Sequence, residues 1–367
     1  MTSQSFEIFL VAPPGLEPPL LTEAHALGLQ GATAGQGGVT CQGGWADVWR
    51  ANLFLRTAVR VVARIGGFRA MHLAQLDKRA RKFDWGAVLR PDVPVRVETT
   101  CKSSRIYHDR AATQRIETAL RESHGLNVSP EAELRIMARI EDDFCSFSLD
   151  TSGAPLHKRG HKEAVNKAPM RETMAAAFLA QCGYDGTEPV VDPMCGSGTF
   201  VIEAAEIAMG LHPGRSRSFA FEQLASFDAG VWAGIKAQTN LRRPTQTFHG
   251  MDRDQGAINM SNANAERAGV TPHCAFTCQP ISDLVPPEGP KGLVIVNPPY
   301  GGRVGNRKLL FGLYGAMGNV LNTRFKGWRF AMVTSDPGLA KATGLRLDAG
   351  PDVAFGGLRV KLYQARL

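Results

Sequence analysis

At the start of its second half the chain reads Val190-Val191-Asp192-Pro193-Met194-Cys195-Gly196-Ser197-Gly198-Thr199. The valines predict the end of a buried strand, and the apolar pattern after Thr199 predicts a helix over 199–209. Glycines between the two elements let backbone N–H groups at the helix N-terminus approach a ligand closely. Asp192, at the strand end, is suited to a cationic ligand because a carboxylate can hold an ammonium group. An ordinary tight strand-to-helix turn is the alternative interpretation.

Two phosphate-binding signatures fit this turn poorly. A dinucleotide fingerprint needs a third glycine three residues after Gly198, where this chain has Val201. A P-loop needs Gly-Lys followed by Ser or Thr, which the turn lacks. Cys195 is a candidate nucleophile, but in a glycine-rich turn we favour a small residue that forms part of the wall.

Strands and helices alternate regularly around this turn. Helices are predicted at 170–179, 199–209 and 255–267, and strands at 189–192, 246–251, 274–278, 293–296 and 329–334. This alternation predicts a doubly wound, mainly parallel sheet, which binds ligands at the carboxyl ends of its strands.

A second motif, Asn297-Pro298-Pro299-Tyr300-Gly301, follows the apolar strand predicted at 293–296. Consecutive prolines restrict the backbone and donate no hydrogen bonds, so the Asn297 side-chain oxygen and the proline carbonyls remain as acceptors. A rigid pair of acceptors suits a planar NH2 group, and Tyr300 offers a face on which a base can stack. Two prolines alone usually form only a turn, but their place after a sheet strand favours a binding site.

A third motif, Gly250-Met251-Asp252-Arg253-Asp254, ends the strand predicted at 246–251. An acidic residue at such a strand end commonly accepts hydrogen bonds from ribose hydroxyls. A helix N-cap is the alternative role, because a helix is predicted at 255–267. We expect Asp252 on the ligand and Asp254 at the cap.

The first 150 residues mix strands and helices in a way that predicts a small α+β module. Strands are predicted at 6–10, 39–41, 94–100, 133–140 and 144–149, and helices at 18–27 and 111–122, while 50–65 mixes both patterns. The middle of the module is basic, with 16 Lys and Arg against 6 Asp and Glu over 50–121. Such a surface attracts polyanions. A solvated helical face is the alternative.

Five basic residues are candidates to contact a polyanion. Lys102, Arg105 and His108 lie in the loop expected after the strand at 94–100. Lys158 and Arg159 lie in 151–169, a polar, basic segment rich in Gly and Pro that we expect to be a surface linker. His157 and His161 in that linker are also candidates for phosphate. All of these are equally compatible with ordinary exposed side chains.

Bulk composition limits the classes of protein that fit. The 367 residues are enough for two or three domains, and 44% are hydrophobic against 21% charged, with a net charge of +8. No apolar run reaches the roughly 20 residues that a membrane span needs. The first ten residues lack the pattern of a secretory signal, and the 7 Cys contain no Cys-x-x-Cys pair, so we expect a cytoplasmic protein with reduced thiols and no metal site.

These motifs, in this order, resemble those of the amino-methyltransferases that carry Asn/Asp-Pro-Pro-Tyr. The fuller resemblance, over nearly the whole chain, is to the THUMP-domain guanine-N2 RNA methyltransferases of the large-subunit ribosomal RNA type. The residues that carry it are Pro14-Gly15-Leu16-Glu17, Arg50-Ala51-Asn52-Leu53, Leu149-Asp150-Thr151-Ser152-Gly153, Leu156-His157-Lys158-Arg159-Gly160, Ala168-Pro169, 192–199, Ile202-Glu203-Ala204-Ala205, Phe219-Ala220-Phe221-Glu222 and 297–301.

The resemblance implies a Rossmann-like class I fold and S-adenosylmethionine (SAM) as cofactor. The cofactor-binding residues that it implies are Asp192, Met194, Cys195, Gly196, Gly198, Thr199, Asp252, Arg253, Asp283 and Asn297, while Asn297, Pro298, Pro299 and Tyr300 would hold the target base. Two positions depart from the family pattern. Gln279-Pro280 stands where the family tends to have an acid, so Asp283 is the remaining candidate to contact the adenine of SAM. Gly302-Arg303 stands where the family often has Glu-Arg.

The same resemblance implies how the chain is divided and what it does. The expected parts are a ferredoxin-like subdomain at 1–55, a THUMP RNA-binding domain at 56–150, the linker at 151–169 and a SAM-dependent methyltransferase domain at 170–367. The expected reaction is methyl transfer to the N2 amine of a guanine in RNA, with large-subunit ribosomal RNA as the partner and no obligate protein partner or membrane. The alternatives are a tRNA substrate, an adenine-N6 DNA methyltransferase, and an RNA-binding protein without catalysis.

Overall fold

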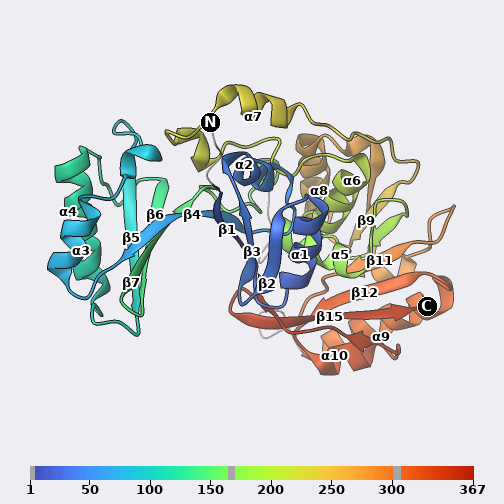
Figure 1. Ribbon diagram of the computed structural model, residues 1–367. Helices are drawn as coiled ribbons and strands as arrows, with labels where there is room; N and C mark the ends of the chain where they lie inside the picture. The colour runs from blue at the N-terminus through green and yellow to red at the C-terminus, as the bar shows by residue number, and fades with distance from the viewer. Residues whose placement is uncertain (1–4, 164–169, 301–306) are drawn as a thin grey trace. The chain divides into compact units, whose positions relative to one another are not determined.

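The computed structural model describes residues 5–163, 170–300 and 307–367, and its chain forms two compact units (Figure 1). Unit 1 comprises Met1–Ala12, Leu20–Leu156 and Arg217–Gln238, and unit 2 comprises Pro13–Pro19, His157–Ser216 and Thr239–Leu367. Each unit has its own sheet. The predicted α/β class, with an α+β region before the parallel sheet, is confirmed.

Unit 1 is built on one continuous seven-stranded sheet with the order β2-β3-β1-β4-β7-β6-β5. Its strands are β1 (Phe6–Val11), β2 (Gln30–Gly35), β3 (Gly38–Gly43), β4 (Arg60–Arg69), β5 (Val95–Lys102), β6 (Leu134–Glu141) and β7 (Phe144–Asp150). All neighbours pair antiparallel except β5 and β6. The sheet runs through both of the parts expected at 1–55 and 56–150, because β4 pairs with β1 on one side and with β7 on the other.

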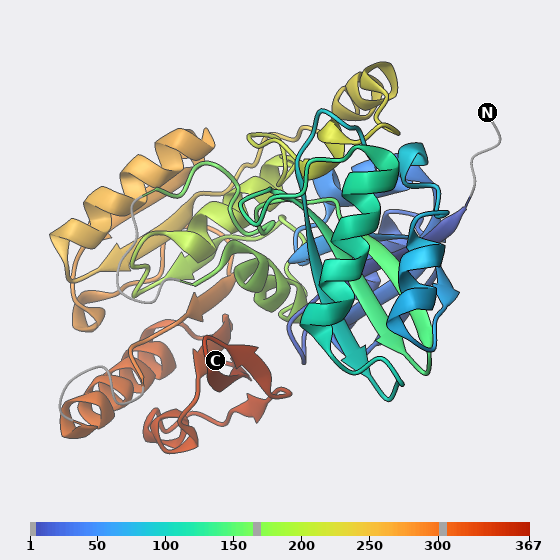
Figure 2. The same cartoon turned by 90° about the vertical axis from the view of Figure 1, so that its left-hand side faces the viewer.

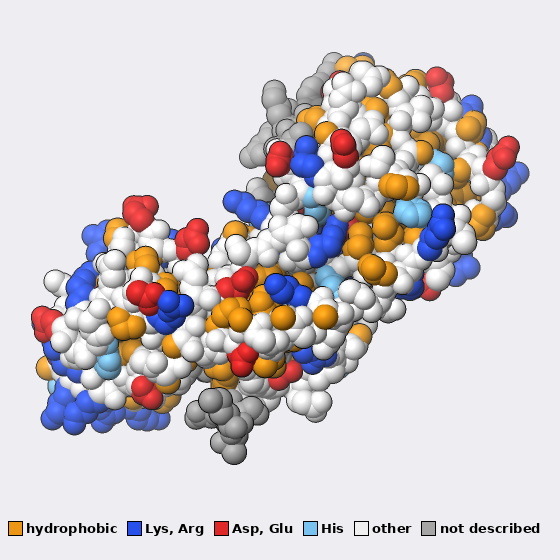
Figure 3. Space-filling model, turned by 90° about the horizontal axis from the view of Figure 1, so that it is seen from above, with side chains coloured by type: hydrophobic (Ala, Val, Ile, Leu, Met, Phe, Trp, Pro, Cys, Tyr) orange, Lys and Arg blue, Asp and Glu red, His pale blue; other side chains and the backbone are white. Residues whose placement is uncertain are grey.

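The ambiguous stretch 50–65 is a helix followed by a strand. Helix α2 (Trp45–Phe54) ends where Leu55 turns to an extended backbone, and β4 begins at Arg60. The other helices of this half are α1 (Glu17–Ala26), α3 (Leu73–Ala80), the 3₁₀ helix η1 (Trp85–Ala87) and α4 (Asp109–His124). Helices α3 and α4 lie side by side over one face of the sheet (Figure 2). Lys and Arg side chains gather at the end of unit 1 that carries these two helices (Figure 3).

The segment 217–238 packs with unit 1, although the expected division placed it in 170–367. It contains η2 (Ala220–Gln223) and α7 (Ala229–Lys236). Its aromatic rings explain the assignment: Phe221 stacks on Trp49 of α2 with ring centroids 5.9 Å apart, and Trp232 meets Phe221 edge-on at 5.0 Å. By its contacts this segment belongs to unit 1, because burial of these rings outweighs sequence proximity.

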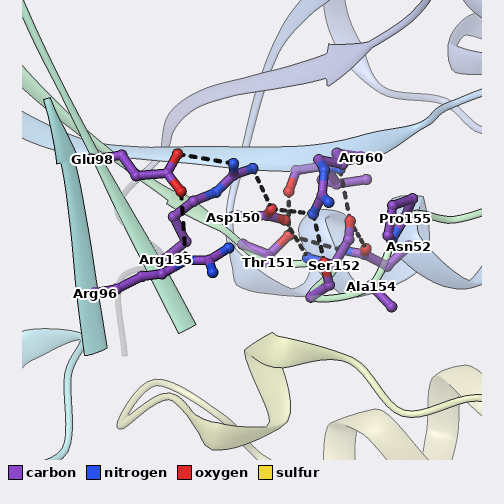
Figure 4. A network of polar contacts seen from close by, with 12 residues as sticks. Asn52, Arg60, Arg96, Glu98, Arg135, Asp150, Thr151, Ser152, Ala154 and Pro155 are labelled. Atoms are coloured by element: carbon purple, nitrogen blue, oxygen red, sulfur yellow. Dashed lines mark hydrogen bonds and ion pairs between the residues drawn. The ribbon is translucent and has the colours of Figure 1, made fainter. Parts of the chain in front are cut away.

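The first part of the expected surface linker is buried in unit 1. Thr151 and Ser152 have no exposed side-chain surface, and Asn52 donates to the Thr151 hydroxyl at 2.9 Å and accepts from the Ser152 hydroxyl at 2.7 Å. Asp150 accepts from Arg135 at 2.7 Å and from Arg60, which also donates to the Gly153 carbonyl (Figure 4). Short polar side chains thus continue the sheet's hydrogen bonding past β7, and the expectation of a solvated linker is wrong here.

Unit 2 contains the predicted doubly wound sheet, with the order β10-β9-β8-β11-β12-β15-β13. Its strands are β8 (Val190–Asp192), β9 (Phe248–Asp252), β10 (Cys274–Cys278), β11 (Leu293–Val296), β12 (Arg329–Thr334), β13 (Asp348–Ala349), β14 (Val353–Phe355), which pairs with β15, and β15 (Leu358–Arg366). The five strands from β10 to β12 are parallel, and β15 runs antiparallel to β12.

Helices complete unit 2 and set the place of the site. They are α5 (Glu172–Gln181), α6 (Thr199–Met209), α8 (Gln255–Ala268), α9 (Arg307–Arg324) and α10 (Pro337–Ala342), with 3₁₀ turns η3 (Thr271–His273) and η4 (Ile281–Asp283). Strand β8 has β9 on one side and β11 on the other, so the strand order reverses between β8 and β11. The carboxyl ends at such a reversal form the ligand crevice of doubly wound sheets. No helix among the described residues is long and apolar enough to cross a bilayer.

Candidate functional site

The glycine-rich turn after β8 is fixed by its own backbone and by the end of β9. The Met194 N–H donates to the Asp192 carboxylate at 3.1 Å, and the Gly196 N–H donates to the Asp252 carboxylate at 3.1 Å. The turn closes when the Gly198 N–H donates to the Cys195 carbonyl at 2.8 Å. The structure thus brings Asp192, the turn and Asp252 together at the strand reversal.

Helix α8 supports the turn from behind through two buried side chains that sequence analysis missed. The Ser261 hydroxyl donates to the Gly196 carbonyl at 3.0 Å, and the Asn264 amide donates to the Ser197 carbonyl at 3.0 Å. Both side chains are fully buried. A signal was present, because Ser261 and Asn264 are three residues apart and so face the same side of the predicted helix as the apolar Ile258 and Ala265.

Gly198 is required by the close contact between the turn and α8. Its φ of 81° lies in the left-handed region, where side chains are strained. A Cβ atom at this position would lie 3.1 Å from the Ser261 hydroxyl and 3.2 Å from the Ile202 side chain. Helix α6 begins directly after it, at Thr199, as predicted.

The acids at the end of β9 and just after it have different roles, and Asp254 has the cap role that the sequence predicted. Asp254 caps α8, accepting the Gly256 N–H at 2.9 Å. Asp252 accepts the Gly196 N–H on one oxygen and the Asp254 N–H, at 3.0 Å, on the other. Each carboxylate oxygen has two lone pairs, so Asp252 retains capacity to accept from a ligand hydroxyl.

Burial sets the charge state of the turn. Burial, and to a smaller degree the neighbouring Asp252 charge, raise the pKa of Asp192 to about 8, although the Met194 N–H opposes the shift. Asp192 is 2% exposed. Burial also raises the pKa of the Cys195 thiol well above its usual range. Cys195 is therefore a protonated thiol, which fits a wall residue and not a nucleophile.

The turn after β11 presents an unused acceptor. The Asn297 Oδ1 atom is buried and has no hydrogen-bond partner within 5–163, 170–300 and 307–367. Behind the turn, the hydroxyl of Tyr314 on α9 donates to the Pro299 carbonyl at 3.2 Å, and Tyr314 is fully buried. Tyr300 is half-buried, and burial raises its pKa to about 12, so its phenol stays neutral. Gly301, Gly302 and Arg303 lie outside the described residues.

Arg159, expected to contact RNA, is instead buried in an ion cluster of unit 2. It is 1% exposed, and its guanidinium pairs with Glu203 at 2.8 Å and with Glu206 at 3.4 Å on α6. Arg215 also pairs with Glu206, at 2.6 Å. The expected RNA contact is wrong for Arg159, because two buried carboxylates on α6 hold its charge in the interior.

His161 and Lys162, which follow Arg159 in the chain, are also largely buried. Burial lowers the pKa of His161 to about 4, so this histidine is neutral and 4% exposed, and the expected phosphate contact is wrong for it too. Lys162 donates to the Thr199 hydroxyl at 2.9 Å and pairs with Glu172 at 3.4 Å beside a small cavity at the start of α6. Segment 157–163 therefore braces the helix that begins at the glycine-rich turn. Lys158 is exposed, and Ala168-Pro169 lie outside the described residues.

The remaining candidates lie at the surface. Arg253 is exposed and its carbonyl accepts from the Cys278 thiol, and Asp283 is exposed in η4, where it accepts from the Ser282 hydroxyl. In unit 1, Lys102 ends β5 and pairs with Glu141 at 3.2 Å, and Arg105 approaches Asp143 to 3.8 Å. His108 occupies the N-cap position of α4 without a side-chain hydrogen bond, and its ring lies tilted against that of Tyr107, with centroids 4.1 Å apart. No group of three or more His, Cys, Asp or Glu side chains in the described parts of the chain could hold a metal ion.

Comparison with known proteins assigns this geometry to a family. The family model described as "RMKL-like, methyltransferase domain" matches residues 159–361, and the model described as "RlmL ferredoxin-like domain" matches residues 7–62. The chain belongs to the RMKL-like methyltransferase family. A relative from Synechocystis named "Putative RNA methyltransferase" is 30% identical over 96% of this chain and 94% of its own length.

Solved structures agree with this RMKL-like assignment. A crystal structure of a protein described as "a putative methyltransferase complexed with SAH" is 27% identical, with a TM-score of 0.86, over 100% of this chain and 99% of that one. A structure of a protein described as "a predicted N6-adenine-specific DNA methylase" from Listeria monocytogenes is 29% identical, with a TM-score of 0.85, over 98% of this chain and 96% of that one.

The residues at the strand reversal fit SAM, the cofactor of this RMKL-like enzyme. The buried Asp192 carboxyl, which lacks a cationic partner among the described residues, suits the ammonium of the methionine part. Asp252 has free lone pairs for the ribose hydroxyls. The backbone of 195–198, free of large side chains, leaves room for a ligand at the N-terminus of α6.

Proposed function

We propose that this RMKL-like enzyme methylates the exocyclic N2 amine of a guanine in RNA, with large-subunit ribosomal RNA as the substrate and the cytoplasm as its location. Unit 1 would contain the THUMP-type RNA-binding region. A tRNA substrate is the alternative, because the THUMP-type region permits it.

One observation carries the proposal: at the carboxyl end of β11, the Asn297 Oδ1 atom is buried and has no donor in the part of the chain that the structure describes. A buried acceptor left without a donor costs about 1–3 kcal/mol, so this atom is poised for a donor brought by the substrate. Pro298 follows it with a carbonyl and no N–H. An aromatic amine has two N–H groups in one plane and can donate one to each acceptor.

The chain's own residues would orient the amine and leave its nitrogen free to react. Bound SAM supplies an electrophilic methyl carbon on a sulfonium. Asn297 and the Pro298 carbonyl would fix the plane of the amine, and Tyr300 would stack on the ring. The Tyr314 hydroxyl, through the Pro299 carbonyl, holds the turn in place. Positioning of this kind can lower a barrier by several kcal/mol, at most about 7–11 kcal/mol. The amine would lose its proton to water as the methyl group leaves sulfur and the N–C bond replaces the S–C bond, so no strong base is required.

Two observations support RNA as the substrate. The Synechocystis relative carries the name of an RNA methyltransferase. Unit 1 contains the basic stretch 50–121, and its α3–α4 end gathers Lys and Arg side chains. A base must leave its stack to reach Tyr300, which unpaired or flipped nucleotides in RNA can do.

The test compares nucleosides of ribosomal RNA, tRNA and DNA from cells with and without the gene. We expect N2-methylguanosine to disappear from one position of large-subunit ribosomal RNA and to return when purified enzyme and SAM are added to that RNA. Loss of N6-methyladenine from DNA instead would favour the activity for which the Listeria protein is named. Intact methylation of all three nucleic acids would overturn the proposal.

Asn297→Ala should lower kcat on the unmethylated RNA on the order of 100-fold, because the amine loses its alignment. Thermal stability should stay close to that of the parent, and the rate is measured at saturating SAM so that any change in SAM affinity does not affect kcat. Asn322→Ala, on the exposed face of α9, is the matched control and should leave kcat unchanged. Equal rates for Asn297→Ala and the control would contradict the role of this turn.

A further inference from the structure

Four exposed cations on or next to helices α3 and α4 of unit 1 have no partner among the described residues. Lys78 in the last turn of α3, Lys82 just after it, and Arg110 and Arg115 on α4 are exposed. Within the described residues none of the four side chains has an ion pair or a hydrogen bond. We call these residues the α3–α4 cations.

The acids on the same helices are already engaged. Asp77 and Glu122 both pair with Arg81 at 2.8 Å, and Glu117 pairs with Arg121 at 3.2 Å. Asp109 accepts the Cys101 N–H at 2.7 Å. The α3–α4 cations are therefore not neutralised by their neighbours, and their positive potential extends into solvent.

Lys102 and Arg105, by contrast, already have acidic partners. Lys102 pairs with Glu141, and the Arg105 backbone N–H and guanidinium both approach Asp143. These acids would have to release their partners before a phosphate could bind. The unpaired α3–α4 cations are thus better placed to attract a polyanion than the residues singled out by sequence.

An exposed aromatic ring precedes Arg110 at the start of α4. Tyr107, two residues before α4, is 71% exposed, and its ring centroid lies 4.1 Å from that of His108 with the two rings tilted. The loop that carries it is held in place, because Arg105 donates to Asp143 and Asp143 donates to the Ser104 hydroxyl at 3.1 Å. A large ring held open to solvent by a rigid loop, three residues before Arg110, can stack on a base while a cation binds the neighbouring phosphate.

We propose that the α3–α4 cations and Tyr107 form an RNA-docking surface of unit 1, in which the cations bind backbone phosphates and Tyr107 stacks on an unpaired base. This proposal rests on the proposed function for the identity of the partner. Strong positive charge beside an exposed ring fits a nucleic acid with single-stranded nucleotides, because both phosphates and open base faces are then available.

The first test removes the charges. In the surface variant, Lys78, Lys82, Arg110 and Arg115 are all replaced by Gln. In the control variant, Lys326, Lys341, Arg346 and Arg359, which are exposed in unit 2, are replaced by Gln for the same change in charge. Both are titrated by filter binding against in vitro transcribed large-subunit ribosomal RNA and against a transcribed tRNA, over a series of KCl concentrations.

Loss of four phosphate contacts should weaken RNA binding of the surface variant on the order of 100-fold at 0.1 M salt and make the salt slope shallower by about 3. The control variant should keep the parent slope, and SAM binding by calorimetry should be unchanged in both. A surface variant whose affinity and slope match those of the control overturns the proposal.

The second test separates stacking from charge. Tyr107→Ala should weaken RNA binding about tenfold with no change in salt slope, while Tyr107→Phe, which keeps the ring, should bind like the parent. Equal RNA binding by Tyr107→Ala and Tyr107→Phe would show that Tyr107 is not part of the docking surface.

Failure of this surface and failure of the proposed function give different results. If the parent methylates RNA and the surface variant binds RNA as the control does, the docking surface is wrong and the methyltransferase function stands. If the α3–α4 cations control RNA affinity but the parent transfers no methyl group to guanine, the docking surface stands and the proposed reaction is wrong.

Discussion

Asp192 shows how burial prepares a single residue for a charged ligand. Its carboxyl has a pKa of about 8, so it is mostly protonated at pH 6.5, where the α-ammonium group of SAM, with a pKa of roughly 7.7–8.0, is charged. A neutral acid cannot pair with the ammonium. Binding must therefore remove the proton that burial placed on Asp192.

We expect SAM binding at pH 6.5 to release close to one proton, since a raised pKa is driven back down when the cation arrives. Calorimetry in two buffers of different ionisation enthalpy measures this number directly. The number should fall as the pH is raised through 8, where Asp192 is already ionised. Asp192→Asn should release no proton, and a parent protein that releases none would show that Asp192 does not face the ammonium.

At the scale of elements, segment 157–163 and α6 form one supporting unit through Arg159, Glu203 and Glu206. The distances of 2.8 and 3.4 Å and an exposed fraction of 1% make this a fully buried ion cluster. Breaking such a cluster by removing one partner leaves an uncompensated charge in the interior. The cluster lies on the helix that begins at the glycine-rich turn, so its loss should disturb the turn as well.

Arg159→Met should lower the free energy of unfolding by about 3–5 kcal/mol, because Glu203 loses a buried cation. Urea unfolding monitored by circular dichroism measures the change. The double variant Arg159→Met/Glu203→Gln, which removes one charge of each sign, should recover part of the loss. Unchanged stability together with weaker RNA binding would indicate that Arg159 contacts RNA, as its sequence context suggested.

At the scale of the whole molecule, the chain leaves unit 1 after Leu156 and returns to it at Arg217. The returning segment adds Phe219, Phe221 and Trp232 to the core of unit 1. A segment inserted between α6 and β9 of unit 2 thus completes the hydrophobic core of unit 1, which connects the folding of the two units.

Trp232→Ala should destabilise unit 1 by about 3–5 kcal/mol, since it removes the ring that meets both Phe219 and Phe221 edge-on. Tryptophan fluorescence reports on unit 1, because Trp45, Trp49 and Trp85 remain there and only Trp328 lies in unit 2. The fluorescence transition in urea should move to lower concentration. The exposed neighbour Val231→Ala is the control, and equal transitions for the two variants would contradict the assignment of this segment.

Local sequence patterns were enough to predict the elements whose signal is short-range. The turn at 190–199, the cap at Asp254, the strands of the parallel sheet and the Asn-Pro-Pro-Tyr motif all follow from short-range patterns, because backbone restriction and apolar periodicity act over a few residues. The resemblance that these motifs support led to the family and the cofactor.

Long-range packing sets which polar residues are buried and what they face. Arg159 lies in a segment with the composition of a surface linker, yet Glu203 and Glu206 of α6 hold its charge in the core. Ser261 and Asn264 support the glycine-rich turn only because the sheet places α8 beside it. Such roles depend on partners more than 40 residues away in the chain, and the charge of a residue does not reveal where its counter-charge will lie.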